Sequence, residues 1–189
     1  MGFPYSGSGT GPASLGGGVA VDAGFGYDFG NSIRGELTYV LGSYAMGTGP
    51  FSGNVRVAGQ NFASNGTLSG TGNVTTNSVM VSGYYDFKSK SRFTPYVGVG
   101  IGYTSVSFPT LIASASVGGT TQNATEAAGG GSAFGYQAKV GISYAVSKPA
   151  DVFAEAIYQG NTAFSINEDS YGALNAFSLR AGARYRFGN

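Results

Sequence analysis

The chain has 189 residues and a net charge of +1; 34 residues are glycine, 10% are charged and 14% are aromatic. A soluble domain carries about 25% charged residues. The composition excludes a disordered chain, which has more charge and fewer aromatics, and a nucleic-acid-binding protein, which needs a basic excess. It also contains no apolar run of 18 residues that would predict a transmembrane helix.

The chain contains no His and no Cys. This removes thiol nucleophiles, zinc sites built from these residues, Ser-His-Asp triads and histidine acid–base catalysis. The sequence therefore predicts no enzyme, no metal site, no cofactor and no disulfide framework. Residues 1–15 lack Lys, Arg and an apolar run, so we expect no signal peptide there.

Apolar residues alternate with small or polar residues, and this period of two predicts β-strands. In residues 19–29, for example, Val19, Val21 and Phe25 lie on one face, whereas Asp22 lies on the other. In chain order, the predicted strands are residues 19–29, 33–44, 78–87, 93–104, 134–144, 152–158 and 177–187.

The connections between these strands alternate in length. The short ones are residues 30–32, 88–92 and 147–150. The long ones are residues 45–77, 109–132 and 159–173, which are rich in Gly, Ser, Thr and Asn. Short turns at one end and long loops at the other are typical of an all-β, up-and-down antiparallel transmembrane β-barrel. The long loops are then extracellular.

Two features indicate that the apolar face meets lipid. Tyr and Phe gather beside the short turns, as an interfacial girdle requires: they are Tyr27, Phe29, Tyr85, Phe87, Phe93, Tyr144, Tyr185 and Phe187. The opposite face is mostly small and nearly neutral, which suits a narrow lumen. A soluble β-barrel, with its apolar face inside, is the alternative; its outer face would carry more Lys and Glu.

The inward face carries seven ionisable residues that we predict to form an ion-pair cluster, because unpaired buried charges are costly. They are Asp22, Arg34, Glu36, Lys139, Glu155, Arg180 and Arg184. We expect Lys139 to pair with Glu155, and either Arg180 or Arg184 to lie close to Glu155. The alternative role for these charges is an ion path through a narrow pore.

Two further motifs have ordinary structural interpretations. Gly98, Gly100 and Gly102 form G-x-G-x-G without the helix that a phosphate loop needs, so we predict that they face the lumen and make room for bulky neighbours. Asn167, Glu168 and Asp169 offer too few oxygens for a calcium site and predict a solvated loop tip.

The segments GYDFGNSIRGELTY, GYYDF, FTPYVGVGIGY, GISYAVS, VFAEAIYQG and LRAGARYRF resemble the small outer-membrane β-barrel family of Gram-negative bacteria, which includes OmpA-like and opacity-type surface antigens. The resemblance implies eight antiparallel strands, a monomer in the cell outer membrane, and a structural, adhesive or antigenic role. A narrow passive channel for ions or small solutes is the alternative. It also implies an assembly signal at Arg180, Gly182, Tyr185 and Phe187.

The same resemblance implies as partners the outer-membrane lipid, the barrel assembly machinery and a host or extracellular ligand at the loops. Only seven strands are visible, in residues 19–187, and residues 1–18 read as a loop-like segment. We therefore expect the first strand to be missing from this chain, or to be replaced by a short piece near Gly2–Ser6.

Overall fold

The computed structural model of the chain is all-β throughout the residues that it describes. These are residues 3–4, 10–11, 15–51, 54–57, 60–63, 66–70, 72–117, 120–162, 164–166, 169–171 and 175–187. None of them belongs to a helix long and apolar enough to cross a membrane.

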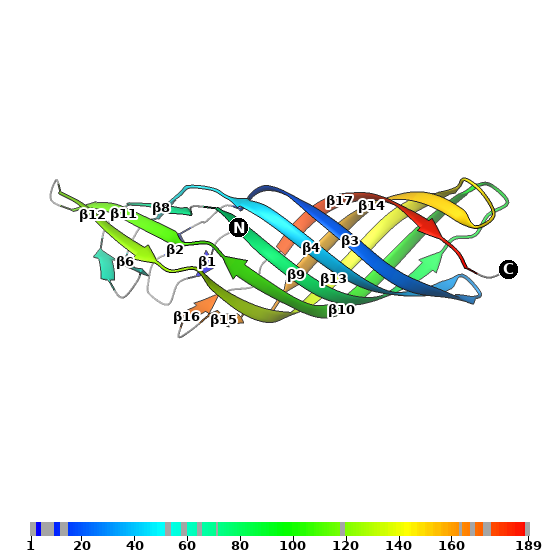
Figure 1. Cartoon of the computed structure of the whole chain (residues 1–189), viewed down its shortest axis with the longest axis horizontal. Coiled ribbons are helices and arrows are strands. Elements are labelled where there is room, and N and C mark those ends of the chain that lie inside the picture. The colour runs from blue at the N-terminus through cyan, green and yellow to red at the C-terminus, as the bar shows by residue number, and fades with distance from the viewer. Residues whose placement is uncertain are drawn as a thin grey trace.

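Seven long strands form one antiparallel sheet that curls around its own inner face (Figure 1). Each strand pairs with its neighbours in the chain, in the order β17-β14-β13-β10-β9-β4-β3. This confirms the predicted all-β, up-and-down antiparallel architecture with seven clear strands. Their bounds are β3 (Leu15–Gly30), β4 (Ile33–Met46), β9 (Asn73–Asp86), β10 (Phe93–Phe108), β13 (Gly129–Ala145), β14 (Ala150–Asn161) and β17 (Asn175–Tyr185).

Among the described residues, ten short strands lie beyond one end of the large sheet: β1 and β2 precede β3, and the other eight belong to the long connections (Figure 1). β5, β8, β11 and β12 form a four-stranded sheet, and the others pair as β1 with β2, β6 with β7 and β15 with β16. Their bounds are β1 (Phe3–Pro4), β2 (Thr10–Gly11), β5 (Gly49–Phe51), β6 (Asn54–Val57), β7 (Gln60–Ala63), β8 (Gly66–Gly70), β11 (Leu111–Val117), β12 (Thr120–Glu126), β15 (Phe164–Ile166) and β16 (Asp169–Tyr171).

Much of what the sequence predicted as loop is therefore strand, and that part of the prediction is wrong. β9 begins at Asn73 and β13 at Gly129, each five residues before the predicted start. β3 begins at Leu15, inside the segment 1–18 that was predicted to be loop. Thr and Val at the start of β9 favour strands, whereas β3 and β13 begin with several glycines. Backbone pairing needs no alternation of side chains, so a two-faced pattern marks only the part of each strand that separates two environments.

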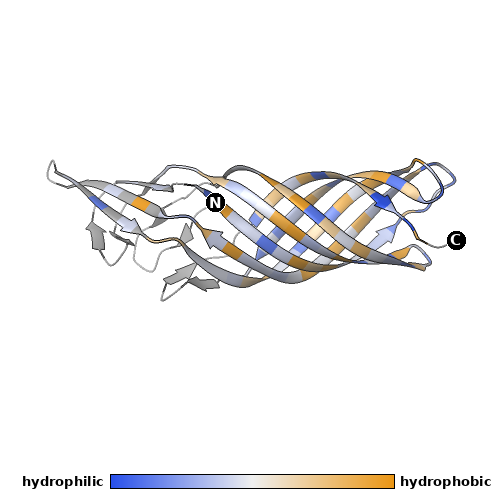
Figure 2. Cartoon of the chain, viewed as in Figure 1, coloured by the Kyte–Doolittle hydropathy of each residue, from blue (hydrophilic) through white to orange (hydrophobic). Residues whose placement is uncertain are grey.

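Side chains on the large sheet divide into an exposed apolar set and a buried polar set. On β10, Val97, Val99 and Ile101 are exposed. Tyr96, which comes directly before them on the same strand, is buried. Lys139 and Glu155 are buried on neighbouring strands. Figure 2 shows the hydrophobic and hydrophilic bands that result along the strands. This is the reverse of a soluble core, in which charged side chains are almost never fully buried.

Inward glycines make room for large side chains in the narrow interior. A Cβ atom on Gly98 would lie 2.5 Å from Cδ1 of Tyr84, and one on Gly102 would lie 2.6 Å from the sulfur of Met80. On Gly100 it would lie 2.8 Å from Nε2 of Gln137. These distances are too short for a side chain, and they confirm that the G-x-G-x-G motif serves packing.

The turn between β3 and β4 needs left-handed backbone. Gly30, Asn31 and Ser32 have φ angles of 77°, 47° and 70°. Gly and Asn adopt such angles at low cost, and a side-chain oxygen of Asp28 accepts a hydrogen bond of 2.9 Å from the Gly30 amide. This turn sets the register of the first hairpin.

The two edge strands of the large sheet, β3 and β17, run in the same direction, because they are the first and the last of seven strands that alternate in direction. Two parallel edges cannot continue an antiparallel ladder with one another. We call the gap between them the seam; among the described residues no strand pairs with its edges. The described part of Gly2–Ser6, Phe3–Pro4, pairs with Thr10–Gly11 and not with either edge; the rest of that segment lies outside the described residues.

We expect Gly98→Val to lower the free energy of unfolding by about 1–3 kcal/mol, because the added side chain overpacks the interior against Tyr84. Urea unfolding of the refolded protein in detergent micelles measures this. The matched control is the outward Gly83 on the adjacent strand, where a Cβ meets nothing within 4 Å; Gly83→Ala should be at least as stable as the wild type. Equal losses at both positions would contradict the assignment of the two faces.

Candidate functional site

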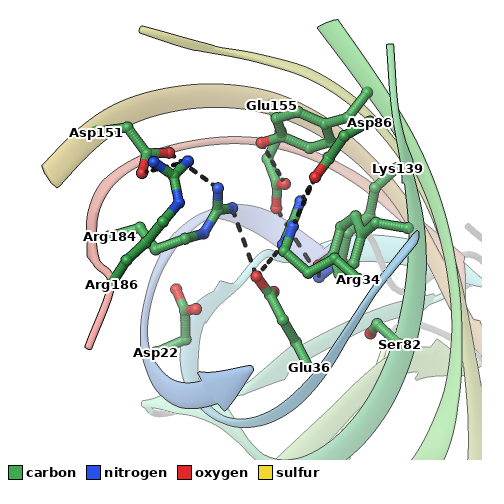
Figure 3. A network of polar contacts seen from close by, with 12 residues as sticks. Asp22, Arg34, Glu36, Ser82, Asp86, Lys139, Asp151, Glu155, Arg184 and Arg186 are labelled. Carbon is green, nitrogen blue, oxygen red and sulfur yellow. Dashed lines mark hydrogen bonds and ion pairs between the residues drawn. The ribbon is translucent and has the colours of Figure 1, made fainter. Parts of the chain in front are cut away.

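The inward charged side chains form one network, which we call the lumen network (Figure 3). Its centre is Glu155 on β14, whose side chain is 1% exposed. The Tyr96 hydroxyl donates a hydrogen bond of 2.9 Å to Glu155 Oε2, and the ammonium of Lys139 lies 3.9 Å from Oε1. Arg180, directly opposite Glu155 on β17, pairs with the same oxygen. Glu155 therefore has three partners from three strands.

Local geometry explains these contacts. Gly141 on β13 lies directly opposite Tyr96 of β10 on one side and Glu155 of β14 on the other. A Cβ atom on Gly141 would lie 2.6 Å from the Tyr96 hydroxyl oxygen. The missing side chain lets the tyrosine reach the carboxylate. Lys139 lies diagonally from Glu155, opposite Ile157, at a spacing that a long side chain spans.

A second part of the network surrounds Arg34 on β4. Its guanidinium donates to both carboxylate oxygens of Asp86, at 3.2 and 3.3 Å, and also to Glu36. The same group stacks 4.1 Å from the ring centroid of Tyr84 and 5.4 Å from that of Tyr96. A desolvated cation over an aromatic face is attracted by the ring quadrupole, so charge and ring contacts together hold Arg34 in place.

The third part surrounds Asp151 at the beginning of β14. Arg184 and Arg186 each approach one of its oxygens at 2.9 Å. Arg184 also lies 3.4 Å from Glu36, which joins this part to the Arg34 part. The network therefore runs continuously from β4 through β17 to β14.

The network joins five basic residues to five acidic residues: Arg34, Lys139, Arg180, Arg184 and Arg186, and Asp22, Glu36, Asp86, Asp151 and Glu155. Equal numbers of opposite charges remove most of the cost of burying each one, because a buried ion is expensive only where it is uncompensated.

All seven residues predicted from the sequence lie in this network. The Lys139–Glu155 pair is present, and the arginine beside Glu155 is Arg180; Arg184 instead faces Asp151. Sequence reasoning missed Asp86, Asp151 and Arg186. Asp86 follows Ser82 and Tyr84 on the inward positions of β9, so the alternation could have identified it. Asp151 lies directly after a short turn, and only the β14–β17 register places it opposite Arg184.

Ion pairs cross the seam at two places, and one of them is the contact between Arg184 on β17 and Glu36 on β4. Arg180 on β17 pairs with Asp22 on β3, although the two strands share no hydrogen-bonded ladder. Asp22 has a side chain that is 21% exposed, against 1% for Glu155. Arg180 therefore links the two edges of the sheet through side chains alone and ties them to the centre of the network.

Neutral polar groups fill the rest of the interior. Gln137 donates to the Ser82 hydroxyl at 2.8 Å, and Lys139 donates to the Tyr84 hydroxyl at 2.8 Å. A hollow bordered by Ser78, Met80 and Gln137 has a volume of only about 10 Å³, room for at most one water molecule. Among the described residues, no group of His, Cys, Asp or Glu side chains is arranged to hold a metal ion.

The outer surface carries aromatic pairs near the short turns. Tyr27 and Phe29 have ring centroids 5.0 Å apart, as do Tyr85 and Phe87. Of the eight predicted girdle residues, seven are exposed and Tyr144 is half-buried. A shallow apolar hollow of about 390 Å³ lies among them over β3 and β4. Its one charged lining residue, Glu36, belongs to the lumen network.

The residues of the predicted assembly signal lie on β17 and just after it. Arg180 and Gly182 face inward, and a Cβ on Gly182 would lie 2.6 Å from the Phe153 ring. Tyr185 and Phe187 are exposed, with ring centroids 4.8 Å apart. Their role in assembly stays a prediction. Of the predicted loop tip, Asp169 begins β16, and Asn167 and Glu168 lie outside the described residues.

An antiparallel sheet with an apolar outer face and a charged, filled interior defines the class of barrel-type β proteins. Residues 54–178, about two thirds of the chain, match the family described as surface antigen, and the chain belongs to that family. The match confirms the predicted resemblance to surface antigens.

The crystal structure of Neisserial surface protein A (NspA) is similar to the chain at 19% sequence identity, with a TM-score of 0.43. That similarity covers 90% of this chain and 95% of NspA. No curated protein sequence matches the chain.

We expect Glu155→Ala to lower the free energy of unfolding by about 3–5 kcal/mol, because it leaves Lys139 and Arg180 buried without their shared carboxylate. Urea unfolding, and the temperature at which the compact gel band shifts, measure the loss. The control is Lys88→Ala, which removes an exposed pair with Asp28 and should cost less than about 1 kcal/mol. Similar losses for the two variants would show that the network is solvated.

Proposed function

We propose that the protein is a non-enzymatic integral protein of the outer membrane, which displays its long connections outside the cell in a structural, adhesive or antigenic role. The observation that carries this proposal is an uncharged outer band between two levels of aromatic side chains. Membership of the surface antigen family supports the exposed location.

The height of this band follows from the distance between the two aromatic levels on the adjacent strands β10 and β13. Phe93 lies opposite Tyr144 near the short turns, and Tyr103 lies opposite Phe134 at the other end. Ten residues separate the two levels on each strand, about 33 Å along a strand at ~3.3 Å per residue. A barrel strand tilted by about 40° converts this to about 25 Å of height, the thickness of the apolar band on outer-membrane barrels.

No outward residue between these two levels on β10 or β13 is charged. The exposed side chains there include Val97, Val99, Ile101, Val140 and Ile142. The charged side chains of the same region point inward and are paired. Hydrocarbon around the outer face explains why the outward residues are apolar and why the charged residues point inward, because a charged side chain is costly in hydrocarbon and an apolar one is not.

The lumen network favours a structural barrel over the alternative function, a narrow passive channel. Conduction requires a continuous water-filled path. The described interior holds paired charges from β4, β9, β13, β14 and β17 and a hollow of only about 10 Å³. We therefore assign the function to the long connections at one end of the barrel. The side chains that fill the lumen then serve to stabilise the barrel.

The proposal includes the partners that such a protein needs. Outer-membrane lipid surrounds the band, the assembly machinery recognises Arg180, Gly182, Tyr185 and Phe187, and an extracellular partner binds the long connections. Lateral contacts between barrels are not required, so the protein is a monomer within its membrane.

The orientation is tested with trypsin on intact cells. Arg56 is the one basic residue in the long connections 45–77, 109–132 and 159–173. We expect cleavage after Arg56 alone, and resistance in Arg56→Gln. Cleavage at Lys88 or Lys90, which lie in the short turn 88–92, would reverse the orientation.

The lipid-facing surface is tested by Val99→Arg, midway between the two aromatic levels. We expect a loss of about 2–4 kcal/mol in the free energy of unfolding, measured by urea titration in phosphatidylcholine vesicles, because the charge enters the centre of the hydrocarbon. Val99→Met, which stays apolar, is the control and should cost less than about 1.5 kcal/mol. Wild-type protein that stays monodisperse without detergent would contradict the membrane assignment.

A further inference from the structure

The four-stranded sheet beyond the barrel has two different edges. β5 is one edge; it has three residues, and its central residue is Pro50. β12 is the other edge; it has seven residues and pairs only with β11. A short strand and a proline are devices that protect a sheet edge from pairing with another chain. β5 therefore carries this protection.

β12 carries none of these devices. Its sequence, TTQNATE, contains no Pro, Lys or Arg, and its one charged residue is the last. Thr121, Asn123 and Thr125 lie on one face of the strand, and all three are exposed. β6 lies near β12 but forms no ladder with it. The described residues therefore leave the backbone groups on this edge available to another strand.

The direction of β12 restricts which partner can use this edge. β11 follows β10 after two residues, and β12 leads into β13 in the same way, so the four strands form one long hairpin that extends from the barrel along its axis (Figure 1). Two copies in one membrane have the same orientation, and their β12 strands are parallel. A copy in a facing membrane is inverted, so its β12 strand is antiparallel.

The sequence of β12 matches an antiparallel pair with itself. Pairing centred on Asn123 places Asn123 opposite Asn123 and Thr121 opposite Thr125 of the second copy, on both sides of the centre. Thr–Thr pairs across strands are stabilising, and no like charges meet at this register. Two copies related by a two-fold axis need such self-complementarity. If Thr121 of one copy contacts Thr125 of the other, then Thr125 of the first copy must contact Thr121 of the second.

We propose that β12 binds β12 of a second copy in a facing membrane, so that the protein joins two cells through a continuous antiparallel sheet. This inference rests on the proposed function, because it needs the long connections to lie outside the cell. It assigns the adhesive surface to one strand and the partner to the same protein.

The test uses the full chain refolded into phosphatidylcholine vesicles, with vesicle tethering followed by light scattering. Asn123→Lys places like charges opposite each other in the pair, and Asn123→Glu does the same with the opposite sign. We expect tethering to fall to the level of protein-free vesicles for each variant alone, and to return when lysine vesicles are mixed with glutamate vesicles. Thr67→Lys, on the central strand β8 and exposed, is the matched control and should tether normally.

A cysteine experiment tests the register, since the chain has no cysteine of its own. Asn123→Cys should form a disulfide between vesicle populations. Thr121→Cys should form none with itself but should cross-link to Thr125→Cys. Disulfides confined to copies in one vesicle would overturn the inference, as would tethering that Asn123→Lys leaves unchanged.

Trypsin separates failure of the inference from failure of the proposed function. If Arg56 is cleaved on the outside of the vesicles and no tethering occurs, the β12 pairing is wrong while the orientation stands. If Arg56 is protected both on vesicles and on intact cells, the proposed function itself is wrong. Binding of a different protein at β12 without tethering also overturns the inference.

Discussion

Compensated charge in a narrow interior is the constraint on which the rest of this structure depends. Seven strands that expose apolar side chains must direct every other residue inward, and the inward set includes five acidic and four basic side chains, to which the half-exposed Arg186 after β17 adds a fifth positive charge. Each of these costs several kcal/mol when buried alone. Glu155 meets Lys139, Arg180 and Tyr96, and Arg34 meets Asp86, Glu36 and two aromatic rings. The interior is stable because nearly every charged side chain in it contacts an oppositely charged one, and several contact more than one partner.

Inward glycines are the second requirement for this packing of charges in the interior. Tyr84 and Tyr96 can lie across the interior because Gly98 and Gly141 face them without a side chain. The large rings then fill the space and hold Arg34, and the hydroxyl of Tyr96 reaches Glu155. The high glycine content of the chain is thus tied to its charge network, since a larger residue at these positions would push the rings away from the charges.

The sheet edges divide the molecule into a stable part and a part available for binding. At the seam, Arg180 and Asp22 connect two parallel edges through side chains. At the other end of the molecule, β5 is protected by Pro50 and its short length, whereas β12 carries no protection. Under the proposed function, the filled barrel holds the β12 edge at a constant height and direction above the membrane.

The sequence by itself determined the strands that separate two environments, the faces that they present and the inward location of the seven predicted ionisable residues. These follow from local backbone geometry, because neighbouring residues in a strand point to opposite sides. Motifs such as FTPYVGVGIGY, which lies within the matched residues, were also sufficient to predict the surface antigen family, which the family match confirms.

Tertiary structure alone decided how these residues pair. The β14–β17 register places Arg180 opposite Glu155 and Arg184 opposite Asp151, and a shift of two residues would separate both pairs without changing the alternation of faces. It also decided that residues 111–117 and 120–126 form a projecting hairpin, since Ser-, Thr- and Asn-rich segments read as loop until a neighbouring strand supplies their hydrogen bonds. Partner choice depends on contacts between residues distant in the chain, and no local pattern encodes it.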